Sequence, residues 1–322
     1  MSFPIFAYML VPLIVFIVAL AALIFSARIF TSSAEKIGHY YQLPPLVIGI
    51  FIVGIGTSLP ELVSAIISAQ NGVSEIVAGN VFGSNISNIL FITGVVALMH
   101  KGDIILSSKY IFIDLHYLIG SMFAISLFSY DGVIDWHESL IGLGIFAVYS
   151  MYLVKNESVV PDQKKIRLNM KGVFPWKNLG YLAIGGLGIY IGAEYTISSL
   201  SALALGFEIP NSIVALTILS LGTTLPELVV NVQAIRKGQA EMAIGNVLGS
   251  SVFNCLVVPT IASFISPLSV PTELLHFALP VMLASALFFY LITHDKRISR
   301  WEGMLFILIY LIFLLKVVES HV

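Results

Sequence analysis

The chain has 322 residues, of which 58% are hydrophobic and 11% are charged, and its mean hydropathy is +0.97. Soluble domains average about 25% charged residues, so this composition predicts an integral membrane protein. The net charge of −2 gives no electrostatic basis for binding nucleic acid. The single cysteine, Cys255, excludes an intrachain disulfide, and packing is its expected role in an apolar segment.

Apolar runs of about twenty residues, which are long enough to cross a bilayer as a helix, recur along the whole chain. They predict an all-α integral membrane protein with ten transmembrane helices. The expected spans cover residues 5–27, 43–69, 74–98, 104–128, 138–154, 178–200, 209–235, 240–264, 272–293 and 301–318. No basic region precedes the first apolar run, so we expect a mature spanning helix there and no cleaved signal peptide.

Basic residues are distributed unevenly among the connections between these spans. Connections after odd-numbered spans carry the lysines and arginines, and only Lys316, near the C-terminus, falls on the other side. Because cytoplasmic loops are enriched in Lys and Arg, we expect a multi-pass protein of the cell membrane. Both termini would lie outside, and the polar central loop, residues 155–177, would lie in the cytoplasm.

One eight-residue string occurs twice in the chain. Gly54–Glu61 reads GIGTSLPE and Ser220–Glu227 reads SLGTTLPE, and Glu227 follows Glu61 by 166 residues. The register then continues without a gap through GN-x-x-GS-x-x-x-N, at Gly79–Asn88 and again at Gly245–Asn254. The chain is therefore expected to be two copies of one unit, each with a repeated segment that contains a glutamate.

Five spans in each copy is an odd number, so the second copy would enter the membrane upside down. Inverted repeats of this kind are the architecture of many secondary transporters. We expect a first half over residues 1–154, with its repeat at about 43–98, and a second half over 178–322, with its repeat at about 209–264. Residues 155–177 would be a cytoplasmic linker between the halves.

Polar residues of the repeated segments fall along helical faces. The first half contributes Gly54, Thr57, Ser58 and Glu61 at i, i+3, i+4 and i+7, together with Ser84 and Asn88 at i and i+4. The second half repeats the pattern with Ser220, Thr223, Thr224, Glu227, Ser250 and Asn254. A carboxylate at membrane depth is costly and indicates a functional site, and the neighbouring Gly and Pro residues free backbone carbonyls.

These groups together predict a hard site built from oxygen atoms alone. Such ligands suit Ca²⁺ and also Na⁺, whereas zinc and copper prefer the Cys and His ligands that the cluster lacks. The two carboxylates carry a charge of −2, which one divalent ion, two monovalent ions or protons can neutralise. Competition for this charge is the electrostatic basis of an antiporter.

The paired GTSLPE and GTTLPE segments, each followed by GN-x-x-GS-x-x-x-N, resemble the alpha repeats of the sodium/calcium exchanger family, within the cation/calcium antiporter superfamily, and are similar to its prokaryotic members. The resemblance covers both halves. It implies ten helices in two inverted halves and ion sites between the second, third, seventh and eighth helices. It also implies alternating access by sliding of the first and sixth helices over the other eight.

The resemblance also implies a role for each matching residue. Glu61 and Glu227 would be the central Ca²⁺ ligands, assisted by carbonyl or hydroxyl oxygens of Thr57 and Thr223. The Na⁺ sites would be lined by Ser58, Ser84, Thr224 and Ser250 and by backbone oxygens of Gly54 and Ser220, with Asn88 and Asn254 beside the central site. Some relatives have aspartate at the position of Asn254, so this chain is expected to use two carboxylates and not three.

The expected function is antiport of Na⁺ and Ca²⁺ across the bilayer, with no cofactor and no enzymatic activity. The alternative is a proton/Ca²⁺ or other cation/Ca²⁺ antiporter that uses the same carboxylates. The proton/calcium branch usually shows a GNA-x-E style motif in place of GTSLPE, which favours sodium here. An intramembrane hydrolase lacks support because GxSxG and HExxH are absent from the sequence, and the inverted repeat argues against a passive channel.

Several other polar residues have simpler expected roles. Glu75 and Glu241 would complement helix dipoles, and Arg28 and Glu194 would anchor helices at the interface. Asp114 and His116 are polar for their depth, and interfacial solvation is favoured for them over proton relay. The small-xxx-small spacing of Gly79, Gly83, Gly245 and Gly249 predicts close helix packing.

Overall fold

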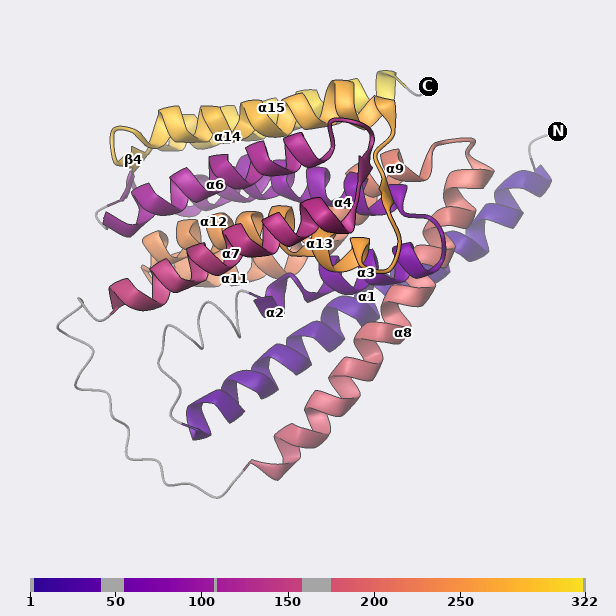
Figure 1. Ribbon diagram of the computed structural model, residues 1–322, viewed down its shortest axis with the longest axis horizontal. Helices are drawn as coiled ribbons and strands as arrows, with labels where there is room; N and C mark the ends of the chain where they lie inside the picture. Colours follow the sequence, from indigo (N-terminus) through magenta and orange to yellow (C-terminus); the bar gives the residue numbers. More distant parts are fainter. Residues whose placement is uncertain (1–2, 42–54, 107–108, 158–174, 321–322) are drawn as a thin grey trace.

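The computed structural model describes residues 3–41, 55–106, 109–157 and 175–320. Gly54 and the start of the expected second span, together with most of the expected linker 155–177, lie outside the described residues. Within the described residues the elements are helices and four two-residue strands. The predicted all-helical class is thus confirmed in its main feature, as Figure 1 illustrates.

The described helices coincide with the expected spans, several of which are broken into shorter pieces. The first half contains α1 Phe3–Tyr40, α2 Ile55–Thr57, α3 Leu59–Gln70, α4 Glu75–Ile86, the π-helical turn η2 Ser87–Ile92, α5 Thr93–Met99, α6 Lys109–Phe128 and α7 Trp136–Glu157. The second half contains α8 Trp176–Gly206, α9 Asn211–Val214, η4 Ala215–Leu219, α10 Ser220–Thr223, α11 Leu225–Arg236, α12 Ala240–Leu256, α13 Val258–Ser263, η5 Leu274–Ala278, α14 Leu279–Thr293 and α15 Arg300–Glu319.

Six helical stretches of the described chain are long and apolar enough to cross a membrane. They are Met9–Gly38, Glu75–Met99, Asn211–Arg236, Met242–Ser263, Leu274–Thr293 and Arg300–Glu319. Each coincides with one of the ten expected spans. The other four expected spans are mainly helical where they are described, but their helices are shorter, interrupted or less apolar.

The largest departure from the expected boundaries is in α1. Its apolar run predicts a helix over residues 5–27, whereas α1 continues to Tyr40, a length of about 57 Å at 1.5 Å per residue. The helix outlasts its apolar run because it packs against α8, which runs beside it at the edge of the molecule (Figure 1). Glycines of α8 permit the approach: a Cβ atom at Gly192 would lie 2.8 Å from the backbone of Leu23.

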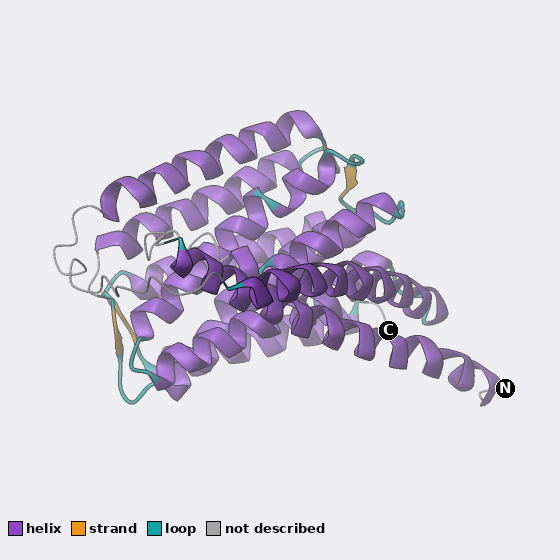
Figure 2. Ribbon diagram, turned by 90° about the horizontal axis from the view of Figure 1, so that it is seen from below, coloured by secondary structure: helices purple, strands orange, loops and turns teal. Residues whose placement is uncertain are grey.

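Two short strand pairs join loops of the first half to loops of the second. β1 (Ile104–Ile105) pairs antiparallel with β4 (Arg297–Ile298), and β2 (Val133–Ile134) pairs antiparallel with β3 (Leu268–Ser269). An all-α interpretation misses these strands, and the expected fourth span begins in β1 for that reason. Because β1 and β2 flank the two ends of α6, the pairs lie at opposite ends of the molecule (Figure 2).

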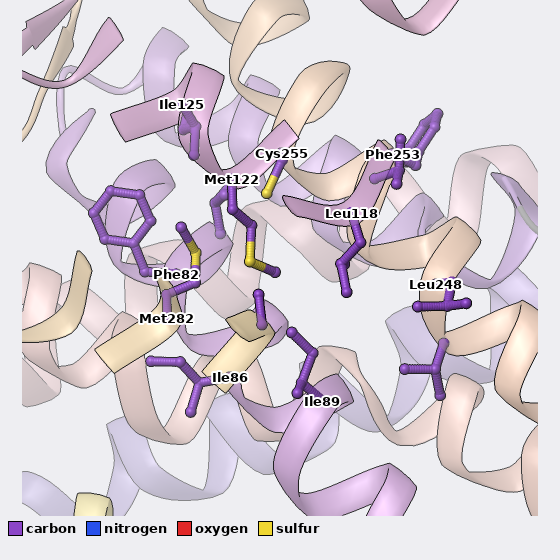
Figure 3. Packing of buried hydrophobic residues seen from close by; sticks show 14 of the residues in the cluster. Phe82, Ile86, Ile89, Leu118, Met122, Ile125, Leu248, Phe253, Cys255 and Met282 are labelled. Atoms are coloured by element: carbon purple, nitrogen blue, oxygen red, sulfur yellow. The ribbon is translucent and has the colours of Figure 1, made fainter. Parts of the chain in front are cut away.

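Buried apolar side chains form two clusters. The larger one joins α4, η2, α6, α12 and α14, and Figure 3 shows Phe82, Met122 and Met282 packed together within it. Cys255 belongs to this cluster and is fully buried, which agrees with a packing role. The smaller cluster joins α1 and α8 to α3, α4 and η4. The α1–α8 pair therefore forms a layer of its own on the rest of the helices.

Candidate functional site

Two helix breaks at equivalent places position the glutamates. The backbone leaves helical geometry at Ser58 (φ −89°, ψ 10°), and α3 begins one residue later with Pro60 in its first turn. The helix is also interrupted at Thr224 (φ −82°, ψ 0°), although the backbone there stays in the α region, and α11 then begins with Pro226 in its first turn. Proline lacks a backbone N–H, so it fits best in the first turn of a helix and disturbs the helix interior. Each break therefore places a glutamate in the first turn of a new helix.

The first turn is a favourable place for a carboxylate, because the positive end of the helix dipole faces it. Glu61 is 1% exposed and Glu227 is 0% exposed, so neither carboxylate is solvated by bulk water. Ser58 Oγ donates to Glu227 Oε1 at 3.2 Å, which joins the first-half break directly to the second-half glutamate. The two carboxylates are close enough to interact electrostatically.

Each glutamate has a threonine of the opposite half beside it. Thr223 lies beside the Glu61 carboxyl group and Thr57 lies beside that of Glu227. Each threonine thus faces the glutamate of the opposite half, and the two pairs are related by the repeat offset. All four residues, which the sequence predicts as Ca²⁺ ligands, are brought together by the fold.

Many oxygen atoms of this region are buried without a hydrogen-bond partner among the described residues. Both carboxylate oxygens of Glu61 and Oε2 of Glu227 have none. The same is true of the side-chain oxygen and nitrogen atoms of Asn88 and Asn254 and of Ser250 Oγ. A buried polar atom without a partner costs about 1–3 kcal/mol, and a charged one costs more. A cation held among these oxygens would offset that cost.

The residues predicted to line Na⁺ sites are all buried where they are described, but their hydroxyls differ in what they contact. Ser220 Oγ donates to the carbonyl of Leu216 at 2.6 Å, and Thr224 Oγ1 donates to the carbonyl of Ser220 at 2.9 Å. Such bonds to the preceding turn are common for hydroxyls in helices. Ser84 lies 3.5 Å from Asn80 Oδ1. The predicted ligand Gly54 lies outside the described residues.

Asn80 also belongs to the site, although it is not among the residues that the sequence predicts as ligands. It is 2% exposed, and its Oδ1 accepts from Thr223 Oγ1 at 3.3 Å as well as from Ser84. The signal was present in the sequence, because Asn80 stands four residues before Ser84 and so shares its helical face. Its repeat equivalent, Asn246, instead donates to Asn231 Oδ1 at 3.1 Å.

Close packing brings α4 against the seventh expected span. A Cβ atom at Gly79 would lie 2.2 Å from the carbonyl of Ser212, and one at Gly83 would lie 2.1 Å from the carbonyl of Leu216. Only glycine permits this approach, so the packing role expected for these two glycines is confirmed. A Cβ atom at Gly245 or Gly249 would meet no described atom within 4 Å.

π-helical turns border the site on both halves. Asn88 lies in η2, and η4 ends directly before Ser220. A π-helical turn inserts one residue into an α-helix and shifts the side chains that follow, and such turns are frequent at functional sites. These two turns set the side chains of Asn88 and Ser220 relative to the glutamates.

Glu75, Asp114 and His116 have contacts with residues other than the two glutamates. Glu75 accepts from Asn211 Nδ2 at 3.0 Å, a contact between helices that its expected dipole role does not include. Asp114 accepts from the hydroxyl of Tyr149 at 3.1 Å, whereas the ring of His116 packs against that of Tyr290. The described residues contain no group of three or more His, Cys, Asp or Glu side chains arranged to hold a metal, so the polar centre of the fold rests on two carboxylates.

Comparison with known proteins identifies the family. A family model described as "Sodium/calcium exchanger protein" matches residues 11–155 and 177–318. The chain belongs to the sodium/calcium exchanger family. Its relatives include an uncharacterized membrane protein of Methanocaldococcus jannaschii, which is 30% identical over 92% of this chain and 95% of that protein. The sodium/calcium exchanger MaX1 of Methanosarcina acetivorans is 30% identical over 93% of this chain and 97% of its own length.

Solved structures give the same answer for the fold. The sodium-calcium exchanger NCX_Mj aligns with a TM-score of 0.66 at 26% identity, over 94% of this chain and 97% of that chain. The H⁺/Ca²⁺ exchanger CAX aligns with a TM-score of 0.77 at 16% identity, over 94% and 82% of the two chains. This member of the family is thus a multi-pass membrane protein and a cation/Ca²⁺ antiporter, in line with the sequence-based assignment to a transporter family.

Proposed function

We propose that this antiporter exchanges Na⁺ for Ca²⁺ by alternating access, at a site in the middle of the membrane centred on Glu61 and Glu227. The observation that carries the proposal is the meeting of these two buried glutamates, one from each half, with three of their four carboxylate oxygens unpartnered among the described residues. Buried carboxylates of this kind need a compensating charge. A Ca²⁺ ion supplies both the charge and the oxygen-seeking coordination.

The charge of the two carboxylates explains why exchange is obligatory. One Ca²⁺ or two Na⁺ ions neutralise it, and moving the bare charges through a low-dielectric region is costly. In this proposal Thr57 and Thr223 complete the Ca²⁺ shell. Ser58, Ser84, Thr224 and Ser250, with backbone oxygens of Gly54 and Ser220, serve Na⁺, and Asn88 and Asn254 line the centre.

The proposal includes ten membrane spans in two inverted halves, residues 1–154 and 178–322, joined by the linker 155–177. Matching local geometry supports it: α3 and α11 are both 12-residue helices displaced by the repeat offset, and the turns after them contain Gly72 and Gly238 with φ of +74° each. The strand pairs obey the same relation. In the repeat, the loop that contains β1 corresponds to the loop that contains β3, and the loop of β2 corresponds to that of β4. The β1–β4 pair is therefore the equivalent of the β3–β2 pair.

The proposed orientation has both termini outside the cell membrane and the linker in the cytoplasm. The basic residues that follow odd-numbered spans support it. Cysteines placed singly at Lys171 and at Asp131, in a background without Cys255, would report the orientation. An impermeant thiol reagent added to intact cells should label the cysteine at position 131 and spare the one at position 171. The opposite pattern would overturn the orientation.

The deciding experiment is uptake of radioactive Ca²⁺ into proteoliposomes that contain the purified protein. One set of vesicles has an outward Na⁺ gradient, and a matched set has an outward proton gradient without Na⁺. We expect uptake in the first set only. Uptake driven by protons alone would overturn Na⁺ coupling and make Glu61 and Glu227 proton carriers, and uptake without any counter-ion would indicate a channel.

A further inference from the structure

We propose that Asn80 is a positioning residue for both kinds of transported ion: its side-chain oxygen orients the hydroxyls of Thr223 and Ser84 so that their oxygen lone pairs face the cations. This inference rests on the proposed function, because it takes Thr223 as a Ca²⁺ ligand and Ser84 as a Na⁺ ligand. It adds a residue of α4 that belongs to neither ligand set.

The chemistry of a hydroxyl ligand requires such a partner. A serine or threonine hydroxyl has one proton and two lone pairs, and it binds a cation through a lone pair. Its proton must then point away from the ion, toward an acceptor. A hydroxyl that turns its proton toward the ion is repelled by it. The acceptor therefore decides whether a nearby hydroxyl is a usable ligand.

Asn80 Oδ1 is that acceptor in the first half. It lies 3.3 Å from Thr223 Oγ1 and 3.5 Å from Ser84 Oγ, and the Asn80 side chain is 2% exposed. Both distances exceed the 2.7–2.8 Å typical of O–H···O bonds, so the two hydrogen bonds are weak. In this proposal their role is to set the direction of the two hydroxyl protons. An amide oxygen has two lone pairs, one for each hydroxyl.

Among the described residues, Thr223 has no better acceptor away from the carboxylates. Its hydroxyl also lies 3.3 Å from the carbonyl of Ser220. That carbonyl already accepts from the backbone N–H of Thr224 at 3.1 Å and from the Thr224 hydroxyl at 2.9 Å. A carbonyl oxygen has two lone pairs, and both are in use. When a cation occupies the space between Thr223 and Glu61, the Thr223 proton is therefore directed to Asn80.

The geometry places Asn80 between two helices as well as between two hydroxyls. Ser84 belongs to α4 and Thr223 to α10, and Gly79 and Gly83 hold α4 close to the segment that leads into α10. A shift of α10 along α4 would release one hydroxyl from Asn80 while the other stays. Asn80 thus links the orientation of a Ca²⁺ ligand to that of a Na⁺ ligand.

The test measures equilibrium binding by the full-length protein in detergent. Calcium affinity is measured by titration calorimetry, and Na⁺ affinity by the Na⁺ concentration that displaces bound Ca²⁺. Asn80→Leu removes the acceptor while keeping the number and branching of the side-chain heavy atoms, and Asn80→Asp keeps an acceptor oxygen. We expect Asn80→Leu to weaken both affinities by roughly tenfold, and Asn80→Asp to bind Ca²⁺ at least as well as the unmodified protein.

A double-mutant cycle separates orientation from a general structural effect. If Asn80 acts through the Thr223 hydroxyl, Asn80→Leu should cost much less Ca²⁺ affinity in a Thr223→Val background than on its own. A merely structural role would give additive losses and a lowered melting temperature in both variants. Asn246→Leu is the matched control. Asn246 has the same repeat position but donates to Asn231, so it should change Na⁺ displacement less than Asn80→Leu.

The outcomes distinguish this inference from the proposed function. Normal affinities in Asn80→Leu, or additive losses in the cycle, would overturn the role of Asn80 while leaving Na⁺/Ca²⁺ exchange intact. Ca²⁺ binding with the expected cycle, but without Na⁺-driven uptake in vesicles, would overturn the exchange and leave Asn80 as an organiser of the Ca²⁺ site. Absence of Ca²⁺ binding by the unmodified protein would overturn both.

Discussion

The two halves of this exchanger-family protein repeat an Asn and a Ser four residues apart, Asn80 and Ser84 on α4 and Asn246 and Ser250 on α12, yet these residues make different contacts. On α4, Ser84 is directed toward Asn80, whose oxygen also reaches Thr223 of the other half. On α12, Ser250 Oγ has no partner among the described residues, and Asn246 pairs with Asn231. Repetition in sequence therefore does not impose repetition in hydrogen bonding. If these residues bind cations as proposed, the hydroxyl of Ser84 is oriented in advance and that of Ser250 is not.

Glutamate substitution tests the part of the comparison in which the halves are alike. We expect both Glu61→Gln and Glu227→Gln to reduce Ca²⁺ uptake into proteoliposomes to background, because each removes half of the carboxylate charge that would balance the Ca²⁺ ion. Glu273→Gln, at an exposed position, is the control and should transport normally. If either site variant keeps normal uptake, the symmetric assignment of the two glutamates fails.

Serine substitution tests the part in which the halves differ. Ser84→Ala should raise the Na⁺ concentration needed for half-maximal exchange by roughly three- to tenfold, since it removes a hydroxyl that is already directed. Ser250→Ala should raise it less, because an undirected hydroxyl must first be ordered. Flux measured over a range of Na⁺ concentrations checks both. An equal loss of Ca²⁺ affinity in Ser84→Ala would instead place Ser84 in the Ca²⁺ shell.

Glycine substitution compares the packing of α4 with that of α12. Gly83→Ala puts a methyl group 2.1 Å from the carbonyl of Leu216, and overpacking of this kind costs about 1–3 kcal/mol. Gly249→Ala, whose methyl group meets no described atom within 4 Å, should be nearly neutral. The melting temperatures of the purified variants give the answer. Equal destabilisation by the two would mean that α12 is packed as tightly as α4.

The smallest expected effect concerns the loops before α7 and α15, each of which caps its helix. Asp135 accepts from the ring of His137 at 3.1 Å and from the backbone N–H groups of His137 and Glu138, and these bonds lower the pKa of Asp135. Ser299 caps α15 with a hydroxyl, which does not titrate. A lowered folded-state pKa gives stability that is present above the unfolded value, about 3.9, and lost as the pH falls through the folded value.

Asp135→Asn should therefore lower the melting temperature slightly at neutral pH and leave it unchanged in strong acid. Ser299→Ala should lower it by a similar amount at both pH values, because its hydrogen bond does not depend on protonation of residue 299. A pH-independent effect of Asp135→Asn would show that the carboxylate charge has no role in the cap.

The repeat, the helix breaks and the glutamates could be predicted from the sequence, because each has a local signature. Proline and glycine at matching positions mark the breaks, and a glutamate inside an apolar run marks a polar centre. The continuation of α1 to Tyr40 could not be predicted, since it depends on packing against a helix that begins at Trp176. The strand pairs and the role of Asn80 also depend on partners from the other half, which local periodicity does not reveal.

The strand pairs have a consequence for how the chain is assembled during synthesis. Ile104 leaves the ribosome almost two hundred residues before its partner Ile298, and Ile134 leaves well before Leu268. The strands β1 and β2 of the first half therefore remain unpaired until their partners β4 and β3 have been synthesised. Contacts so distant in sequence form late. A nascent chain released before residue 298 would thus carry β1 without the strand that pairs with it.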